Sequence, residues 1–303
     1  MSAQQPDISM IVLCHNGERY LEEVVTAISS QKTQFHFELI AIDSGSRDRT
    51  LEILRNYPVK IHQIENRDFG HGKTRNLGVG LASGRYVVFL TQDATPAHET
   101  WLENLVRPLA DDQRIAATYS RQIPRPDCNP CEQRDIELGA GPVSAEKRVN
   151  LEDEFQKKMY DANFRQLVLF SNVSSCIRKD ILEQMPFTEK TAMVEDQEWC
   201  KRAIEAGWTV RYEATSAVYH SHNHSLRALY KRQFDYGASY KEFVPLRVSF
   251  MNVLTYTAYQ TLLDSAFILG RPRDMRWKLM WIAKCPLVRL VMRYGLYKGL
   301  RSP

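Results

Sequence analysis

Two acidic residues in this sequence of 303 residues stand where a protein could use a charge for chemistry. Asp93 follows the apolar residues 86–90, whose β-branched and aromatic side chains predict a strand buried on both faces. A carboxylate at the carboxyl end of such a strand needs a partner, and a metal ion or a phosphate-binding network is the usual one. Asp196 follows Glu195 at the start of a predicted helix, whose dipole stabilises negative charge. The sequence equally allows plainer roles, with Asp93 beginning a turn and Asp196 capping a helix.

Three histidines alternate further along the chain, in the segment 217–224. Alternate side chains of an extended segment point to the same side, so two or three of His220, His222 and His224 can converge. Neutral imidazole is a frequent metal ligand. The pattern therefore indicates a metal site, to which not all three histidines need contribute.

The elements that must position these residues alternate between strand and helix. Strands are predicted at residues 8–13, 37–42, 59–64 and 86–90, and helices at 18–30, 49–56 and 74–82. Such alternation with short connections predicts an α/β fold, with a doubly wound, mostly parallel central sheet and helices on both faces.

Polar residues end three of the predicted strands, namely His15-Asn16, Asp43-Ser44 and Gln92-Asp93. A parallel sheet brings all three to one edge, beside the glycine-rich loop 69–73, which is typical of a nucleotide pocket. No GxGxxG follows Asp43, and residues 69–74 lack the spacing of a Walker loop. These absences argue against a dehydrogenase and a P-loop enzyme.

The composition is that of an ordinary globular protein, with 44% hydrophobic and 25% charged residues. A net charge of +4 is too small to argue for a nucleic-acid partner, and none is expected. The polar start of the chain and six scattered cysteines predict a cytoplasmic protein with reduced thiols. Residues 128–131 form a lone CxxC, which we interpret as a proline-containing turn. Residues 121–150 are interpreted as an extended active-site loop or, equally, as a plain surface loop.

The C-terminal part of the chain, residues 226–303, is predicted to be helical, basic and amphipathic, after a catalytic domain at residues 1–225. Its basic residues in the last stretch are Arg271, Arg273, Arg276, Lys278, Lys284, Arg289, Arg293, Lys298 and Arg301. No uncharged run reaches the ~18 residues that span a bilayer. Two interpretations stay open: a basic helix on the inner face of the cell membrane, or a helical subdomain that packs on the sheet or on a partner chain.

The order of motifs along residues 8–240 resembles that of the family-two inverting glycosyltransferases with the GT-A fold. The motifs are CHN with Glu18, DSGSRDRT, FGHGKTRNLG, FLTQDATP, VEDQEW and HSHNHS. FGHGKTRN and LTQDA resemble most the bacterial rhamnosyltransferases that build O-antigen and other surface polysaccharides. The expected fold is therefore GT-A with a C-terminal helical extension.

The resemblance assigns donor-binding roles to the loops after the strands. It implies that the base and ribose pocket is lined by Cys14, His15, Asn16 and Glu18. Asp43 would contact the pyrimidine, and Arg75 would brace the acidic centre and the diphosphate. Thr91 stands where the family usually has the first Asp of its DxD motif, and Gln92 would take over part of that role.

The resemblance also assigns the chemistry. Asp93 matches the second Asp of the DxD motif and would bind Mg²⁺ or Mn²⁺, with His220 or His222 completing the ligand set. Asp196 matches the Asp of the family's ED motif, which is the general base.

The reaction implied is the transfer of a single sugar, because the QxxRW motif of processive synthases is missing. The donor expected is dTDP-β-L-rhamnose, and the acceptor a saccharide or lipid-linked saccharide. Two alternatives stay open, a UDP-hexose or UDP-N-acetylhexosamine donor, and a non-catalytic nucleotide-sugar-binding protein of a polysaccharide assembly complex. A nucleotidyltransferase would show a glycine-rich loop near the N-terminus, where residues 13–16 have none.

Overall fold

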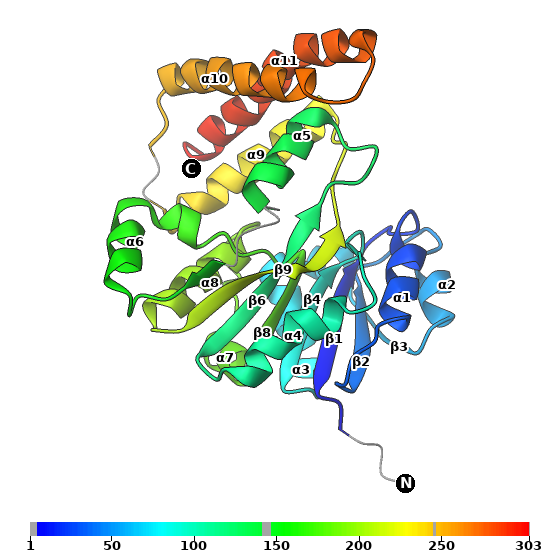
Figure 1. Ribbon diagram of the computed structural model, residues 1–303. Helices are drawn as coiled ribbons and strands as arrows, with labels where there is room; N and C mark the ends of the chain where they lie inside the picture. The colour runs from blue at the N-terminus through cyan, green and yellow to red at the C-terminus, as the bar shows by residue number, and fades with distance from the viewer. Residues whose placement is uncertain (1–4, 141–146, 245–246, 303) are drawn as a thin grey trace. The chain divides into compact units, whose positions relative to one another are not determined.

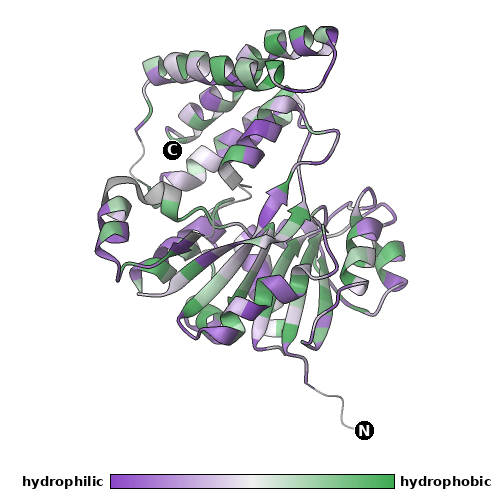
Figure 2. Cartoon of the chain, in the orientation of Figure 1, coloured by the Kyte–Doolittle hydropathy of each residue, from purple (hydrophilic) through white to green (hydrophobic). Residues whose placement is uncertain are grey.

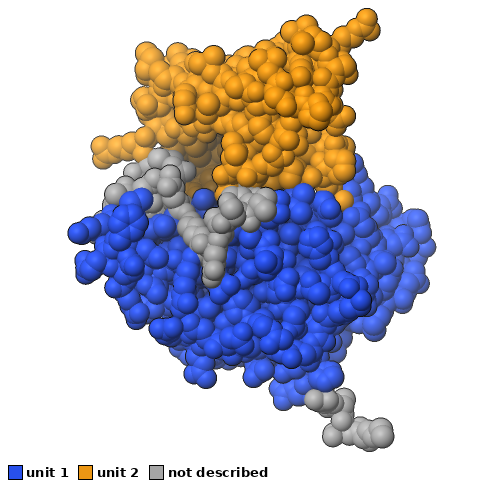
Figure 3. Space-filling view, in the orientation of Figure 1, with its two compact units in different colours: residues 1–123, 141–189, 195–220 blue, residues 124–140, 190–194, 221–303 orange. Residues whose placement is uncertain are grey.

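The computed structural model describes residues 5–140, 147–244 and 247–302 (Figure 1). The chain divides into two units (Figure 3). Unit 1 consists of residues 1–123, 141–189 and 195–220, and unit 2 of residues 124–140, 190–194 and 221–303. The boundary predicted after residue 225 lies five residues beyond the point where the chain enters unit 2 for the last time. The sequence did not indicate that two earlier segments belong to unit 2.

Unit 1 is built on one mixed sheet whose strands, among the described residues, follow the order β3-β2-β1-β4-β8-β6-β9-β5, with β7 paired to β9. The strands are β1 Ile8–Cys14, β2 Phe37–Asp43, β3 Val59–Gln63, β4 Tyr86–Thr91, β5 Thr95–Pro96, β6 Ile115–Ile123, β7 Lys147–Val149, β8 Ser174–Arg178 and β9 Thr209–Tyr219. Strands β1 to β4 pair in parallel, as predicted. Strand β8 runs antiparallel to both β4 and β6, so the sheet is not parallel throughout.

Helices cover both faces of the sheet, which confirms the predicted doubly wound arrangement. In unit 1 they are α1 Leu21–Ser29, α2 Thr50–Arg55, α3 His71–Leu81, α4 Trp101–Asp111, α6 Glu154–Leu167, α7 Lys179–Gln184 and α8 Glu195–Glu205, with a 3₁₀ turn η1 at Asn66–Asp68. Alternate residues of β1 point to opposite faces: Met10 packs with α1, α2 and α4, whereas Ile11 packs with α3, α7 and α8. The strands between the two helical layers are largely apolar (Figure 2).

Three local predictions need correction. Helix α3 begins at His71, so part of the predicted glycine-rich loop is helical. Helix α4 was not predicted, although its buried residues Trp101, Leu102, Leu105, Val106 and Leu109 have helical spacing. The predicted loop 121–150 contains α5 Pro130–Asp135, the π-helix η2 Ile136–Ala140 and β7, while residues 141–146 lie outside the described ranges. The proline of the CxxC segment starts α5, because Asn129 caps that helix by accepting from the Glu132 amide.

Unit 2 consists of α5, η2, α9 Leu226–Tyr240, α10 Phe250–Leu269 and α11 Met275–Gly299. A buried charged cluster joins three of these helices: Asp264 of α10 accepts from Arg134 of α5 at 2.5 Å and from Arg289 of α11 at 2.6 Å. Helices α9 and α11 approach closely at Gly299, where a Cβ would lie 2.1 Å from the Phe234 carbonyl.

Within the described ranges, no helix combines the length and the apolar character needed to cross a membrane.

Candidate active site

Three polar loops meet at one edge of the sheet, because β2, β1 and β4 are neighbours and run in parallel. Gln92, after β4, holds the loop after β1 through two hydrogen bonds. The His15 amide donates to Gln92 Oε1 at 2.9 Å, and Gln92 Nε2 donates to the His15 carbonyl at 2.9 Å. The His15 ring in turn lies with Nδ1 3.1 Å from the Ser44 carbonyl of the loop after β2. The sequence-predicted convergence of these loops is therefore observed.

Gly17 makes room for this contact. A Cβ at Gly17 would lie 2.3 Å from Gln92 Oε1, so any side chain would push the amide away from the His15 backbone. The glycine is thus needed for its lack of a side chain rather than for an unusual backbone angle.

The other predicted donor residues of this edge differ in exposure. Asn16 and Glu18 are exposed. Their side chains bind the loop after β2, where they accept from the amides of Arg47 at 2.9 Å and Arg49 at 3.1 Å. Asp43 is fully buried and accepts from the amides of Gly45 and Ser46 at 3.1 Å each.

Cys14, also predicted to contact the donor, has its thiol in the core. Burial raises the pKa of this thiol, so it stays neutral. The Cys14 carbonyl accepts from the Ser44 amide at 2.9 Å. Direct contacts of Cys14 and Asp43 with a nucleotide stay predictions.

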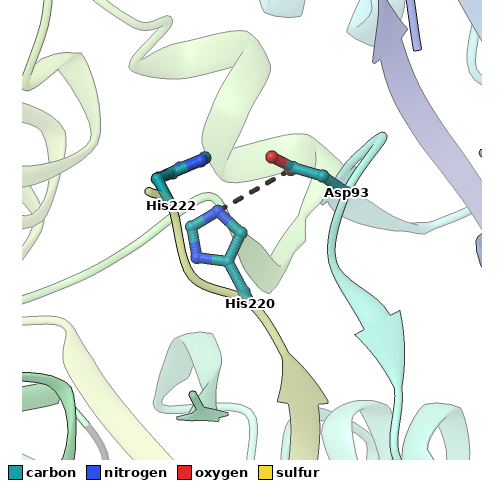
Figure 4. A group of neighbouring side chains, drawn as sticks. All are labelled: Asp93, His220 and His222. Carbon is teal, nitrogen blue, oxygen red and sulfur yellow. Dashed lines mark ion pairs between the residues drawn. The ribbon is translucent and has the colours of Figure 1, made fainter. Parts of the chain in front are cut away.

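The predicted metal ligands Asp93 and His220 face each other in unit 1. His220 Nε2 lies 3.7 Å from Asp93 Oδ1 (Figure 4). Asp93 lies between β4 and β5, and His220 follows the end of β9, so the pairing of Thr95 with Tyr219 brings the two side chains together. His222 lies two residues farther along the chain, in unit 2.

A residue that the sequence did not single out, Gln122 of β6, orients the His220 ring. His220 Nδ1 donates to Gln122 Oε1 at 3.0 Å, so Nδ1 carries a proton and Nε2 is the ring nitrogen that faces Asp93. Gln122 Nε2 donates to Ser171 Oγ at 3.3 Å. A carboxylate and an imidazole nitrogen that face each other suit a divalent cation such as Mg²⁺ or Mn²⁺.

Asp196, the predicted base, lies in the first turn of α8 and is partly exposed. The Asn172 amide donates to Asp196 Oδ2 at 3.1 Å, and the Gln197 amide donates to Oδ1 at 2.8 Å. Burial and the neighbouring Glu195 carboxylate raise the pKa of Asp196 to about 7, while Arg75 and the two amides oppose the rise. A carboxyl group with a pKa near neutrality is well matched to accepting a proton.

Arg75 and Glu195 form a buried ion pair directly beside Asp196. Arg75 lies on α3, which begins within the FGHGKTRNLG motif, and Glu195 is the first residue of α8. The pair joins the two helices and sets the charge around the base. The role predicted for Arg75 toward the diphosphate stays a prediction, and Glu195 received no role from the sequence.

Strand pairing brings Asp93 and Asp196 to the same edge of the sheet. The Thr91 amide donates to the Val173 carbonyl at 3.1 Å, and Leu90 pairs with Ser174 in the antiparallel β4–β8 register. The residue before Val173 is Asn172, whose amide binds Asp196. The end of β4, which leads to Asp93, therefore lies beside the segment that holds Asp196.

The functional residues that sequence reasoning missed are those that act through another side chain: Gln122, Asn172 and Glu195. Glu195 could have been found, because it is adjacent to Asp196 in an acidic pair. Gln122 and Asn172 carried no signal, since their partners lie 98 and 24 residues away.

Comparison with known proteins identifies the family. A model of glycosyl transferase family 2 matches residues 9–185. The O-antigen chain rhamnosyltransferase RfbN of Salmonella typhimurium is 34% identical over 235 residues, which are 76% of this chain and 71% of the relative. WbaN of Salmonella anatum, also an O-antigen chain rhamnosyltransferase, is 33% identical over 77% of this chain and 71% of its own.

Solved structures confirm the GT-A fold at low sequence identity. The mannosyltransferase PcManGT from Pyrobaculum calidifontis, in complex with GDP-Man and Mn²⁺, has a TM-score of 0.61 at 15% identity and covers 98% of this chain and 86% of its own. S. aureus TarS in complex with UDP-GlcNAc has a TM-score of 0.57 at 19% identity, and the match covers 92% of this chain and 71% of the TarS chain. The resemblance expected from the motifs is confirmed at the level of family and fold.

Proposed function

Because this chain belongs to glycosyl transferase family 2, we propose that it transfers one L-rhamnosyl group, with inversion, from dTDP-β-L-rhamnose to a hydroxyl of a saccharide acceptor. The acceptor is a lipid-linked saccharide of surface polysaccharide synthesis. The observation that supports the proposal most directly is the β4–β8 pairing. It brings the end of β4, which Asp93 follows, next to the segment that holds Asp196. The choice of rhamnose is supported by two Salmonella rhamnosyltransferases at 34% and 33% identity.

The donor nucleotide binds across the loops after β1, β2 and β4 in this proposal. His15, Asn16 and Glu18 are exposed there and offer a ring, an amide and a carboxylate for the base and ribose. Gln92 occupies the position between Thr91 and Asp93 and ties its loop to His15. Thr91 Oγ1 is buried and makes no hydrogen bond to any described residue, so it can bind a donor group.

Asp93 and His220, with His222 as the third ligand, would hold Mg²⁺ or Mn²⁺. When bound, the cation neutralises charge that develops on the diphosphate leaving group. The protein's part is to fix both ligands. Asp93 is held at the end of β4, and the His220 tautomer is set by Gln122. The structural neighbour PcManGT was solved with Mn²⁺, which supports a divalent cation here.

Asp196 accepts the proton of the acceptor hydroxyl. As the acceptor oxygen forms its bond to the anomeric carbon, the bond from that carbon to the diphosphate oxygen breaks, and the hydroxyl proton passes to Asp196. A single displacement of this kind inverts the anomeric centre, so a β-linked donor gives an α-L-rhamnoside. A positioned base contributes ~10²–10⁴-fold to the rate.

A panel of nucleotide sugars tests the donor. The protein is mixed with MnCl₂ and, in turn, dTDP-β-L-rhamnose, UDP-glucose, UDP-N-acetylglucosamine and GDP-mannose, and nucleotide release is measured with and without a lipid-linked acceptor. Among the four donors, we expect nucleotide release only from dTDP-β-L-rhamnose. Release from a UDP sugar instead would establish the alternative that the TarS complex with UDP-GlcNAc favours. Binding of a donor without any release would point to the non-catalytic alternative.

Asp93→Ala tests the cation site in the same assay. We expect this variant to lose Mn²⁺-dependent donor binding, measured by calorimetry, whereas binding of the free nucleotide without Mn²⁺ stays as in the wild type. Equal Mn²⁺-dependent binding in both proteins would exclude Asp93 as a ligand.

The proposal also includes the inner face of the cell membrane as a contact of unit 2. Helices α10 and α11 expose large apolar side chains, among them Phe250 at 53%, Met251 at 64%, Leu262 at 70% and Leu279 at 60%. Residues 271–301 carry nine basic residues against Asp274, and of these nine Arg289 is buried in the cluster with Asp264. Apolar side chains with excess positive charge suit an anionic lipid surface. Flotation with phosphatidylglycerol vesicles should recover the protein, whereas phosphatidylcholine vesicles should not. Equal recovery with both would remove the electrostatic part of the argument.

A further inference from the structure

Unit 2 contains a cavity of about 280 Å³, and none of its lining residues belongs to the site described above. Its walls come from α5, from the segment before α9, from the first turns of α9 and from the middle of α11. A volume at the low end of the range for ligand pockets suits one small ring rather than an extended molecule.

One wall of this cavity is apolar and contains an aromatic platform. It is formed by Leu226, Leu229, Trp281, Val288 and Met292. Trp281 is partly exposed, so its indole offers a flat apolar surface to a ligand. Trp277 lies one turn earlier on α11, with its ring 6.3 Å from that of Trp281, and is not among the lining residues.

The other lining residues carry charges that largely balance. Glu132 accepts from the His222 amide at 2.9 Å, and Arg232 attracts its carboxylate, although burial raises the pKa of Glu132. Asp135 is paired with Arg289 at 2.6 Å. Gln233 adds a neutral amide to the lining.

This combination selects the chemistry of the ligand. Because the carboxylates of Glu132 and Asp135 already have the cations Arg232 and Arg289 beside them, the cavity offers no excess positive charge to a phosphate or a carboxylate ligand. A wholly apolar ligand would remove water from Glu132 without replacing its hydrogen bonds. A neutral ring with one face of C–H groups and an edge of hydroxyls satisfies both sets of lining residues, because the C–H face packs on Trp281 and the hydroxyls reach Glu132 and Gln233.

We infer that this cavity binds one sugar unit of the acceptor saccharide, an inference that rests on the proposed glycosyl transfer. His224, which lines the cavity, follows His220 by only four residues, so the two α-carbons are at most ~14 Å apart. The cavity fixes which sugar precedes the hydroxyl that is glycosylated.

The test uses the full-length protein and a panel of neutral methyl glycosides, those of L-rhamnose, D-galactose, D-mannose and N-acetyl-D-glucosamine. Binding is followed by saturation-transfer NMR, and inorganic phosphate serves as the anionic probe. We expect at least one glycoside to bind and phosphate not to compete. Trp281→Ala should weaken that binding about tenfold, as loss of an aromatic contact costs ~0.5–1.5 kcal/mol beyond the lost area.

Trp277→Ala is the matched control, since it removes an indole from the same helix outside the cavity, and its glycoside affinity should stay within about twofold. Gln233→Leu removes a lining amide without removing a core side chain and should also weaken binding, which covers the case that Trp281→Ala does not fold. In the transfer assay both lining variants should raise KM for the acceptor and leave KM for the donor unchanged.

Failure of this inference is distinguishable from failure of the proposed function. If no glycoside binds, or if Trp281→Ala and Gln233→Leu bind like the wild type, the cavity is not a sugar site even where transfer proceeds. If glycosides bind in a Trp281-dependent manner but no donor is consumed, the cavity stands as a sugar site and the proposed reaction falls.

Discussion

Replacing Asp196 by asparagine should abolish transfer and at the same time stabilise the protein near neutral pH. Asparagine is nearly isosteric with aspartate but cannot accept the acceptor's proton, so kcat should fall by ~10²–10⁴-fold. The donor loops lie after β1, β2 and β4, away from α8 in sequence, so KM for the donor should stay within about threefold.

The effect on stability follows from the pKa of Asp196. Burial and Glu195 raise this pKa from 3.8 to about 7 in the folded protein. Because the folded pKa is the higher one, the group's contribution to stability is fully present below pH 3.8 and is lost as the pH rises to about 7. Between about pH 5 and pH 7 this amounts to about 3 kcal/mol at ~1.36 kcal/mol per pKa unit. Since the side chain is partly exposed, we expect about half, on the order of 1 kcal/mol.

The assay compares thermal unfolding of the wild type and Asp196→Asn in EDTA at about pH 5 and pH 8. Asparagine resembles the protonated acid at every pH, whereas the wild type loses stability from pH 3.8 upward, so the variant should melt above the wild type at both pH values. This Tm difference should be about 2–4 °C larger at the higher pH, as ~1 kcal/mol predicts for a unit of this size. An equal Tm difference at both pH values, or transfer within tenfold of the wild type, would refute the reasoning.

The same reasoning gives a companion test at Glu195. Glu195→Gln removes a charge that raises the pKa of Asp196, so the acid limb of the pH–rate profile should move to lower pH. It also leaves Arg75 without its buried partner, which should destabilise the protein by about 3 kcal/mol. An acid limb that stays in place would show that Asp196 is not the group that titrates in the rate.

The remaining predictions concern the two contacts that fix the metal ligand and the donor loop. Gln122→Leu removes the acceptor that orients His220 and should weaken Mn²⁺ binding, measured by electron paramagnetic resonance, by about 10–100-fold, whereas Gln122→Glu keeps an acceptor oxygen and should retain most of the affinity. Equal loss in both variants would mean that the ring orientation is set elsewhere. Gly17→Ala displaces Gln92 from the His15 backbone and should raise KM for the donor about tenfold with little change in kcat, measured by steady-state kinetics.

The sequence predicted what depends on local pattern. Strands β1 to β4 were found because their apolar runs are bounded by polar turns, and the convergence of their loops followed from parallel pairing. Asp93, Asp196 and His220 were recognisable because each lies in a motif of conspicuous chemistry. Helix α4 was not predicted, although the helical spacing of its apolar residues was sufficient to predict it.

What could not be predicted depends on contacts between distant residues. Gln122 lies on the strand β6, in a stretch that reads as polar and irregular, and only the packing of β9 beside β6 brings it to His220. The buried cluster of Asp264 with Arg134 and Arg289 likewise joins residues 130 and 25 positions apart. Single charged residues in helices give no local signal of such burial, so the assignment of residues 124–140 to unit 2 was not predictable.

The direction of β8 explains how Asp196, on α8, comes to lie at the same edge of the sheet as Asp93, which follows β4. In a sheet that is parallel throughout, the residue before a strand lies at the edge opposite the ligand, because ligands bind at the carboxyl ends. Asn172 precedes β8, yet it lies at the carboxyl end of β4, since β8 runs antiparallel to β4. The Asn172 amide can therefore hold Asp196 at the edge where Asp93 emerges. The departure from parallel pairing, which the sequence did not predict, is thus the feature that brings the segment holding Asp196 to the edge of the sheet where Asp93 emerges.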